Sequence, residues 1–346
     1  MTPWHPAWVY RKDIAIVPEL VMNRGIGVLA AVVAATACGE TTGPGGLNDP
    51  TGLRLSLAAI DAVFASPVVR SVGLFLYGVP IPQPVGGAPL IPDSLLGKTF
   101  AFNCDSQRYM VTAQTGAPAR AVRLMLYQLA LAGSILCPAT AIGQLDLTDA
   151  STADTTAIRV TATGVGDGAA YVDYSIRHAA ADPQFAATAV GWVSDGHQRV
   201  DFHGAGHRGP VFNSSVAVMQ LEDSAADAHA TLTDSADMGV DTWSDDVPLT
   251  FGHGGVTLGL SGVASWANTL MSWDQIVTVD NLPFAKVGGA LVPEGGQPTL
   301  SPLGRPVPFT EEEGLLLLDL VAAPGTVRFD LIRLLSAGAH LVGIAL

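Results

Sequence analysis

The stretch AIRVTATGVGDGAAYVDYSIR, Ala157–Arg177, predicts the fold of this chain more directly than any other. Apolar and polar residues alternate through Ala157–Val165 and again through Ala170–Arg177, which is the period of a strand with one buried face. Between the two runs, Gly166-Asp167-Gly168 contains an Asp-Gly pair, a strong signal for a tight hairpin turn. The stretch therefore predicts two neighbouring antiparallel strands.

The same rhythm continues on both sides of this hairpin. Asp195-Gly196 is a second turn signal, and Cys104-Asp105-Ser106 separates two runs that predict a further hairpin. Strands with one solvated face account for the many Ser, Thr and Asp residues. The other predicted strands are Val68–Tyr77, Lys98–Asn103, Gln107–Thr112, Ala121–Leu129, Ile142–Leu147, Ala186–Ser194, Gln198–His203, Phe212–Leu221, His229–Thr233, Val256–Ser261, Ala264–Met271 and Gln275–Val279.

Helices are predicted at the two ends of this β-rich region. Asn48-Asp49-Pro50-Thr51 is typical of a helix start, and Leu53, Leu57, Ile60 and Phe64 follow at helical spacing. Near the other end, Thr310 and Glu313 form a capping-box pattern before a very apolar run. Pro324-Gly325 is expected to stop that helix, and a second helix is expected over Thr326–Ser336.

The predicted fold class is α+β or mainly β. It consists of a large antiparallel sheet or sandwich with one N-terminal and two C-terminal helices, the latter from about residue 309. Residues 51–346 are expected to form a single large domain. We expect Pro80–Pro92 and Pro283–Pro308, both rich in Pro or Gly, to be connections without regular structure.

The segment Met22–Ala37 has the three parts of a secretory signal. Met22-Asn23-Arg24 supplies one positive charge, Ile26–Ala35 is a short apolar region, and Thr36-Ala37 are small residues before Cys38. About ten apolar residues are too few to span a hydrocarbon core of roughly 30 Å as a helix. The alternative is a core helix that ends at a cysteine by chance.

Ala35-Thr36-Ala37-Cys38 resembles the lipobox of bacterial lipoprotein precursors, although that family usually has Leu where Ala35 stands. The resemblance implies that Cys38 is lipidated and becomes the new N-terminus. Gly39 after the cysteine, in place of Asp, implies sorting to the outer membrane, facing the periplasm or the surface. Residues 38–50, which include a Gly-rich stretch, are expected to be a flexible tether.

Residues 1–21 are not needed by such a signal. Trp4, Trp8 and Tyr10 are large aromatic residues that fit it poorly. We expect the true start to be Met22, which would make residues 1–21 a mis-annotated extension. The alternative is an extended charged region that contains Arg11 and Lys12.

Composition and cysteines narrow the classes of function. The formal net charge is −14, and a strongly acidic surface repels a phosphate backbone, so we expect no nucleic-acid partner. With Cys38 lipidated, Cys104 and Cys137 remain as an even pair, which predicts a disulfide in an oxidising compartment. The alternative is two buried free thiols. The sequence contains no C-x-x-C motif, so neither a redox site nor a zinc ribbon is indicated.

Candidate metal ligands are few. Asp201, His203 and His207 lie with Asp195 and His197 in one stretch, but Gly204 and Gly206 disfavour the helix that would put His203 and His207 on one face. A polar, solvated hairpin end is the alternative. The acidic run from Glu222 to Asp246 lacks the order of a calcium-binding loop, and we expect a solvated acidic edge there. No metal or other cofactor is predicted.

No enzyme motif is present where one would be informative. Ser261 lacks the second glycine of G-x-S-x-G, and neither a phosphate-binding loop nor H-E-x-x-H occurs. Four tryptophans could line a pocket, although core or sheet packing is the alternative: Trp192, Trp243, Trp266 and Trp273.

We expect a non-enzymatic envelope lipoprotein that acts as a binding or scaffold module. Its partners would be the bilayer, through the acylated Cys38, and an envelope protein or a small apolar ligand. The alternatives are an envelope hydrolase with an unrecognised site and a carrier of a lipophilic molecule.

Overall fold

The computed structural model describes residues 47–73, 89–114, 116–130, 133–166, 168–179, 187–208, 214–223, 228–238, 242–246, 248–267, 270–291, 298–303 and 307–342. Residues 1–46, with the predicted signal and Cys38, lie outside the described residues. The described strands are β1 (Thr99–Asn103), β2 (Arg108–Val111), β3 (Ala121–Tyr127), β4 (Ala141–Asp149), β5 (Thr155–Gly164), β6 (Ala170–Ala179), β7 (Ala187–Ser194), β8 (Arg199–Arg208), β9 (Ser214–Asp223), β10 (Ala228–Met238), β11 (Thr242–Asp246), β12 (Leu249–His253), β13 (Val256–Ala267), β14 (Leu270–Val279), β15 (Leu282–Leu291) and β16 (Thr299–Pro302). The helices are α1 (Pro50–Phe64), α2 (Pro67–Val72) and α3 (Glu311–Leu341), with a short 3₁₀ turn at Asp93–Leu95.

These sixteen strands pair into one sheet, which confirms the predicted fold class. From β3 to β11 the strands lie side by side in chain order, and β13 to β16 continue the sheet at the far end. β12 pairs with both β10 and β13. Within the described strands, the pairing of β1 with β3 is parallel, and all other pairings are antiparallel.

The alternation read from Ala157–Arg177 sorts the side chains between the two faces of the sheet. Val160 pairs with Leu147 on β4 and with Tyr174 on β6, and all three side chains are buried. Arg159, the residue before Val160, is exposed on the opposite face. The sheet therefore has an apolar inner face and a polar outer face, as expected for a half-covered antiparallel sheet.

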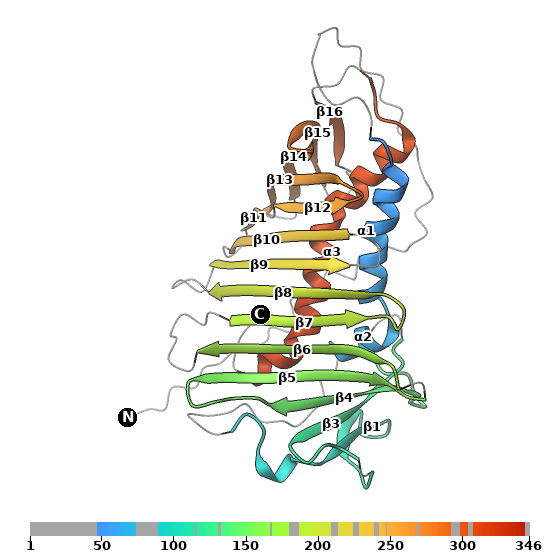
Figure 1. Ribbon diagram of the computed structural model, residues 1–346, viewed down its shortest axis with the longest axis vertical. Coiled ribbons are helices and arrows are strands. Elements are labelled where there is room, and N and C mark those ends of the chain that lie inside the picture. The colour runs from blue at the N-terminus through green and yellow to red at the C-terminus, as the bar shows by residue number, and fades with distance from the viewer. Residues whose placement is uncertain are drawn as a thin grey trace. The chain divides into compact units, whose positions relative to one another are not determined.

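All three helices cover the inner face. In Figure 1, α1 and α3 run side by side across the strands, with α2 beyond the end of α1. The predicted start of α1 is confirmed, because Asp49 Oδ1 accepts a hydrogen bond from the Gly52 amide at 2.8 Å. The predicted stripe is buried as well, and it consists of Leu53, Leu57, Ile60 and Phe64. This packing joins helices and sheet into one apolar core.

The capping box at the start of α3 is also confirmed. The Thr310 amide donates to Glu313 Oε2 at 2.8 Å, and the Glu313 amide donates to Thr310 Oγ1 at 3.2 Å. With 31 residues, α3 is about 46 Å long at 1.5 Å per residue. Strands lie about 4.8 Å apart, so α3 crosses roughly ten of them. It begins beyond Phe309, which packs on Phe284 of β15, and its Gly338 reaches Ile158 of β5.

The two C-terminal helices follow one another without an interruption. We expected a stop at Pro324-Gly325, but the backbone is helical throughout Glu311–Leu341. A proline inside a helix costs about 3 kcal/mol. Each fully buried leucine contributes about 1.5–3 kcal/mol, and leucines are buried on both sides of the proline, at Leu316, Leu317, Leu320, Leu331, Leu334 and Leu335. Packing on the sheet therefore outweighs the local break.

Two stretches differ from the predicted secondary structure. The strand expected over Val68–Tyr77 is wrong, because α2 occupies Pro67–Val72. Pro67 suits the first turn of a helix, and the buried position between α3 and the sheet overrides the strand propensity of the valines. The connection expected over Pro283–Pro308 contains β15 and β16. Pro283 is accepted in β15 because it stands at the second residue, beside a register shift in β14.

The bounds of other strands also differ from the predicted ones. Val256–Ser261 and the first half of Ala264–Met271 form one strand, β13, which passes through Gly262 at a positive φ of 115°. The acidic stretch that we expected to be a solvated edge contains β10 and β11, which pair in the interior of the sheet. The side chains of Asp245 and Asp246 lie outside the described residues. The strand predicted over His229–Thr233 is the first part of β10, whereas the rest of β10 and β11 were not predicted. Their polar residues gave no apolar alternation, because one face of such a strand can be solvated.

Tyr174 ties the sheet to α3 through a buried hydrogen bond. Its hydroxyl donates to the Leu334 carbonyl at 2.7 Å, and its ring packs against Phe202. Burial raises the pKa of Tyr174 well above its ordinary value, so the hydroxyl stays protonated. Gly191 makes room for the ring, because a Cβ there would lie 2.4 Å from the Cβ of Tyr174.

Two glycines on the helices should respond in opposite ways to alanine. At Gly73, a Cβ would lie 2.7 Å from the Arg333 carbonyl oxygen of α3, whereas at Gly314 in α3 the space is open. We expect Gly73→Ala to lower the free energy of unfolding by about 1–3 kcal/mol through overpacking. Gly314→Ala should raise it by up to about 1 kcal/mol through helix propensity. Urea denaturation followed by circular dichroism measures both, and equal effects would contradict the close approach of α2 and α3.

Candidate functional site

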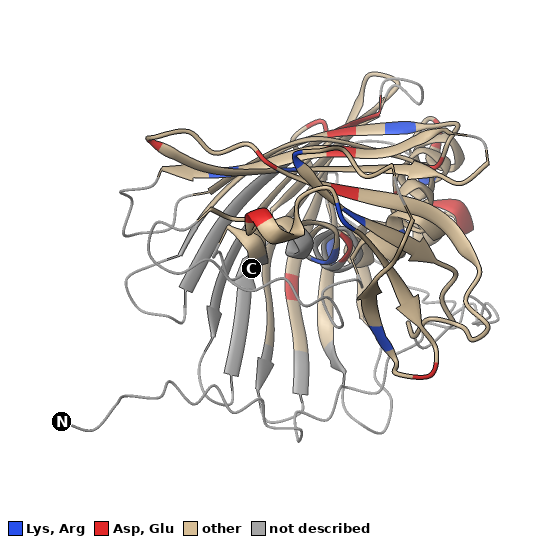
Figure 2. Cartoon of the chain, turned by 90° about the horizontal axis from the view of Figure 1, so that it is seen from below, with Lys and Arg blue, Asp and Glu red and all other residues tan. Residues whose placement is uncertain are grey.

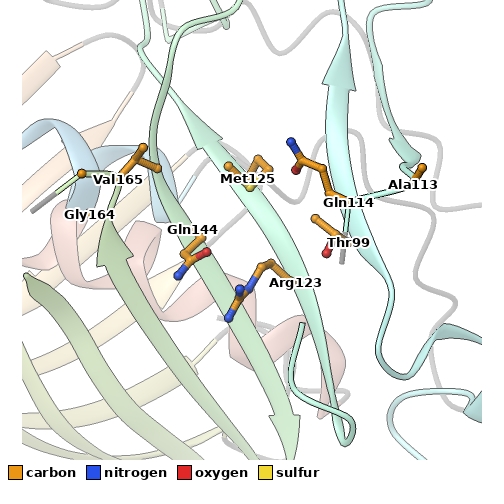
Figure 3. Close-up of a pocket in the computed structure, with 9 residues that line it drawn as sticks. Thr99, Ala113, Gln114, Arg123, Met125, Gln144, Gly164 and Val165 are labelled. Atoms are coloured by element: carbon orange, nitrogen blue, oxygen red, sulfur yellow. The ribbon is translucent and has the colours of Figure 1, made fainter. Parts of the chain in front are cut away.

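A hollow opens on the outer face of the sheet. It has a volume of about 650 Å³ and lies across β1, β3 and β4, beside the turn that follows β5 (Figure 3). Its lining combines polar and apolar side chains, and it consists of Thr99, Ala113, Gln114, Arg123, Met125, Gln144, Gly164, Val165 and Gly166. We call it the β1–β4 hollow.

The hollow lies where the chain-order meander of the sheet is interrupted. β1 lies parallel to β3 with Thr99 opposite Arg123, and the chain must travel from β2 back to β3. That connection supplies Ala113 and Gln114 as one wall. Parallel neighbours need a crossover longer than a hairpin turn, so this wall is a consequence of the topology.

The hairpin of β1 and β2 is held on the sheet from two sides. The buried Tyr109 hydroxyl donates to the Met125 carbonyl at 2.9 Å, and the ring contacts Phe102 edge to face. Cys104 in the hairpin turn is bonded to Cys137 in the connection before β4, which confirms the predicted disulfide. Both contacts restrain the strand that carries Thr99.

Arg123 is the charged group of the hollow. Its Nε donates to Asp146 Oδ1 at 2.7 Å and its Nη2 donates to Asp146 Oδ2 at 2.6 Å, a two-point ion pair that is mostly buried. This hydrogen bonding raises the pKa of Arg123, although burial acts in the opposite direction. A guanidinium has five N–H donors, and the pair with Asp146 uses two of them. The net charge of the pair is zero, but donors remain for a ligand.

Thr99 lies at the base of the hollow. Its side chain is only 2% exposed, and its Oγ1 has no hydrogen-bond partner within the described part of the chain. A buried hydroxyl without a partner costs about 1–3 kcal/mol. Unpaired buried polar groups are uncommon and often mark sites that a ligand or water completes.

The remaining groups complete a neutral, hydrogen-bonding surface. Gln144 is held by a bond from its Nε2 to Thr163 Oγ1 at 3.0 Å, and Gln114 stands on the opposite wall above Thr99 (Figure 3). Met125 and Val165 add apolar area. No carboxylate, histidine or cysteine lines this hollow. The arrangement therefore suits binding through hydrogen bonds.

A second, smaller hollow contains part of the predicted metal candidates. Asp201 and His203 line it together with Glu222 and His229, and its volume is about 370 Å³. Asp201 lies opposite Glu222, and Glu222 lies opposite His229, in neighbouring strands of the outer face. The side chain of the third candidate, His207, lies outside the described residues.

The candidate ligands in this hollow do not converge. Within the described residues, no group of three or more His, Cys, Asp or Glu side chains could hold a metal ion. Asp201 accepts hydrogen bonds from Arg199, whose guanidinium lies 4.7 Å from the centroid of the Trp192 ring. Trp192 therefore packs on the outer face beside this ion pair. The side chains of Trp243 and Trp266 lie outside the described residues.

One serine–histidine pair occurs away from both hollows. Ser56 on α1 and His253 on β12 are hydrogen-bonded, with 3.1 Å between Ser56 Oγ and His253 Nδ1. Ser56 is buried on the face of α1 that packs against the sheet. The pair links a helix to a strand and gives a buried hydroxyl a partner, and neither residue lines a described hollow.

Charge is mixed on the outer face. Figure 2 shows acidic and basic positions close together on the described strands. The pairs on the strands are Arg123–Asp146, Arg159–Asp173, Arg199–Asp201 and Lys286–Asp274. The described strands therefore present a polar surface of alternating sign.

Sequence reasoning did not find the β1–β4 hollow. Thr99, Arg123 and Gln144 belong to three strands, and their residue types carry no motif. The alternation in Ala121–Leu129 placed Arg123 on the outer face, but not beside Thr99. That neighbourhood depends on the parallel pairing of β1 with β3.

Comparison with known proteins gives no match. No protein-family model, no curated protein and no solved structure matches this chain. Within the described residues, no helix combines the length and the apolar character needed to cross a membrane.

Replacing Thr99 by valine should stabilise the free protein. Valine keeps the shape and strand propensity of threonine and removes the buried hydroxyl that has no partner, so we expect a gain of about 1 kcal/mol in the free energy of unfolding. Thr163→Val is the matched control, because Thr163 Oγ1 accepts the bond from Gln144 and its loss should not stabilise. Thermal denaturation of the ligand-free proteins measures both. A Thr99→Val variant that is less stable than the control would contradict the assignment.

Proposed function

We propose that this chain is a cell-envelope lipoprotein, anchored through acyl chains on Cys38, that binds a small polar ligand in the β1–β4 hollow without catalysing a reaction. The observation that carries the binding role is the combination of the unpartnered, buried Thr99 hydroxyl with the remaining donors of Arg123. The mixed lining favours a ligand with oxygen acceptors and modest apolar area.

Two features support export to the envelope. Met22–Cys38 contains the charged, apolar and small-residue regions of a lipoprotein signal. Cys104 and Cys137 are paired, and structural disulfides persist in oxidising compartments. The resemblance of Ala35–Cys38 to a lipobox favours the outer membrane as the destination.

The alternatives receive less support from the described residues. A hydrolase would need a nucleophile and a base that face a cleft, whereas Ser56 is buried between α1 and the sheet. A carrier of a lipophilic molecule would need an apolar cavity under the sheet. Both described hollows open on the outer face, and the side chains between sheet and helices form one packed cluster. These observations favour a polar, water-exposed binding site.

Lipidation makes a direct prediction for Cys38. In cells, Cys38→Ser should move the protein from the membrane fraction to the soluble fraction without unfolding it. Serine has no thiol to carry the acyl chains, and stable anchoring needs more than one such chain. Intact mass should show the wild-type chain beginning at an acylated Cys38. Gly39→Asp is the matched control, which should keep the acyl chains but change the membrane in which the protein is found. A wild-type chain that begins at Met1 and carries no lipid would contradict the proposal.

The binding role predicts that filling the β1–β4 hollow removes a co-purifying molecule. Met125 lines this hollow and Val190 lines the second one, so Met125→Trp and Val190→Trp form a matched pair. Each protein is purified from the native envelope and denatured. The small molecules that it releases are then compared by mass spectrometry. We expect a small molecule present in wild type and Val190→Trp to fall at least tenfold in Met125→Trp. An identical extract from all three proteins would contradict the assignment of the hollow.

A further inference from the structure

The first described residues are attached to the start of α3. The Leu47 amide donates to Glu313 Oε1 at 3.0 Å, while the other oxygen of the same carboxylate accepts from the Thr310 amide. Glu313 is only 2% exposed, and a buried carboxylate bonded in this way holds its partners firmly. The chain that leads back to Cys38 therefore leaves the domain at the N-terminal end of α3.

The length of chain between this point and Cys38 is short. About nine residues separate Cys38 from Leu47, and a fully extended chain of that length spans roughly 30 Å. An acylated Cys38 lies in the bilayer surface, so the N-terminal end of α3 stays close to it.

The β1–β4 hollow lies at the opposite end of the sheet. From Glu313 to Gly338, which contacts Ile158 of β5, α3 rises about 38 Å. Thr99 and Arg123 lie beyond β5 in the strand order, on β1 and β3, which adds about 14 Å at 4.8 Å per strand. The hollow is therefore about 50 Å from the attachment point, along the direction in which α3 runs in Figure 1.

We propose that the lipid anchor holds the domain upright, with the start of α3 at the bilayer and the β1–β4 hollow about 50 Å away in the aqueous compartment. The hollow then takes its ligand from water and not from the membrane. This inference rests on the proposed lipidation of Cys38. It deepens the proposed function, because it limits the ligand to water-soluble molecules with oxygen acceptors.

Fluorescence quenching from the bilayer tests this orientation. Val307, just before α3, and Val165, at the rim of the hollow, are both about half exposed and suit single labels in Val307→Cys and Val165→Cys. The acylated, full mature proteins are labelled with a fluorophore and reconstituted into phosphatidylethanolamine and phosphatidylglycerol vesicles that contain an energy-acceptor headgroup. We expect energy transfer from the Val307→Cys label to be at least fivefold stronger than from the Val165→Cys label.

Each other result is decisive. Equal transfer from both labels on protein that floats with the vesicles would show a flat domain and overturn the orientation while leaving lipidation intact. Stronger transfer from Val165→Cys would show an inverted domain with the hollow at the membrane. Protein that has no acyl mass on Cys38 and does not float would overturn the proposed lipoprotein and this inference together.

Discussion

Everything in this domain depends on covering one face of a very wide sheet. An antiparallel sheet can leave one face in water, but its apolar face must be packed against a second layer. That layer is thin here, because α1 and α3 lie side by side across the strands with α2 beside them. The buried leucines of α3 and the Tyr174 bond to the Leu334 carbonyl hold the two layers together. The same burial keeps α3 continuous through Pro324, where local sequence favours a break.

This one-sided cover determines where a binding site can lie. The space between helices and sheet is occupied by packed side chains, so the described hollows are found on the outer face. The larger one arises where β1 pairs in parallel with β3 and the chain must cross back, leaving Ala113 and Gln114 as a wall. The buried Arg123–Asp146 pair brings donors to this place without net charge.

The two ends of the domain are held by different contacts. At one end, Glu313 caps α3 and binds the Leu47 amide, which joins the chain that leads to Cys38 to the longest helix. At the other end, Tyr109 and the Cys104–Cys137 disulfide restrain the hairpin that carries Thr99. α3 and the strands that it crosses lie between the attachment of Leu47 and the β1–β4 hollow.

Several features were decided by local sequence. Residue alternation predicted the strand pairs around Ala157–Arg177, and the caps at Asp49 and Thr310 predicted the helix starts, because both depend on neighbours within a few residues. Tertiary packing decided the rest. Residues 67–72 form the helix α2 where a strand was predicted, and α3 continues through Pro324. Part of the predicted Pro/Gly-rich connection forms β15. Tertiary packing also placed Thr99 opposite Arg123, since a long-range parallel pairing leaves no periodic signal in either segment. Burial energy from distant residues exceeded the local preferences at each of these places.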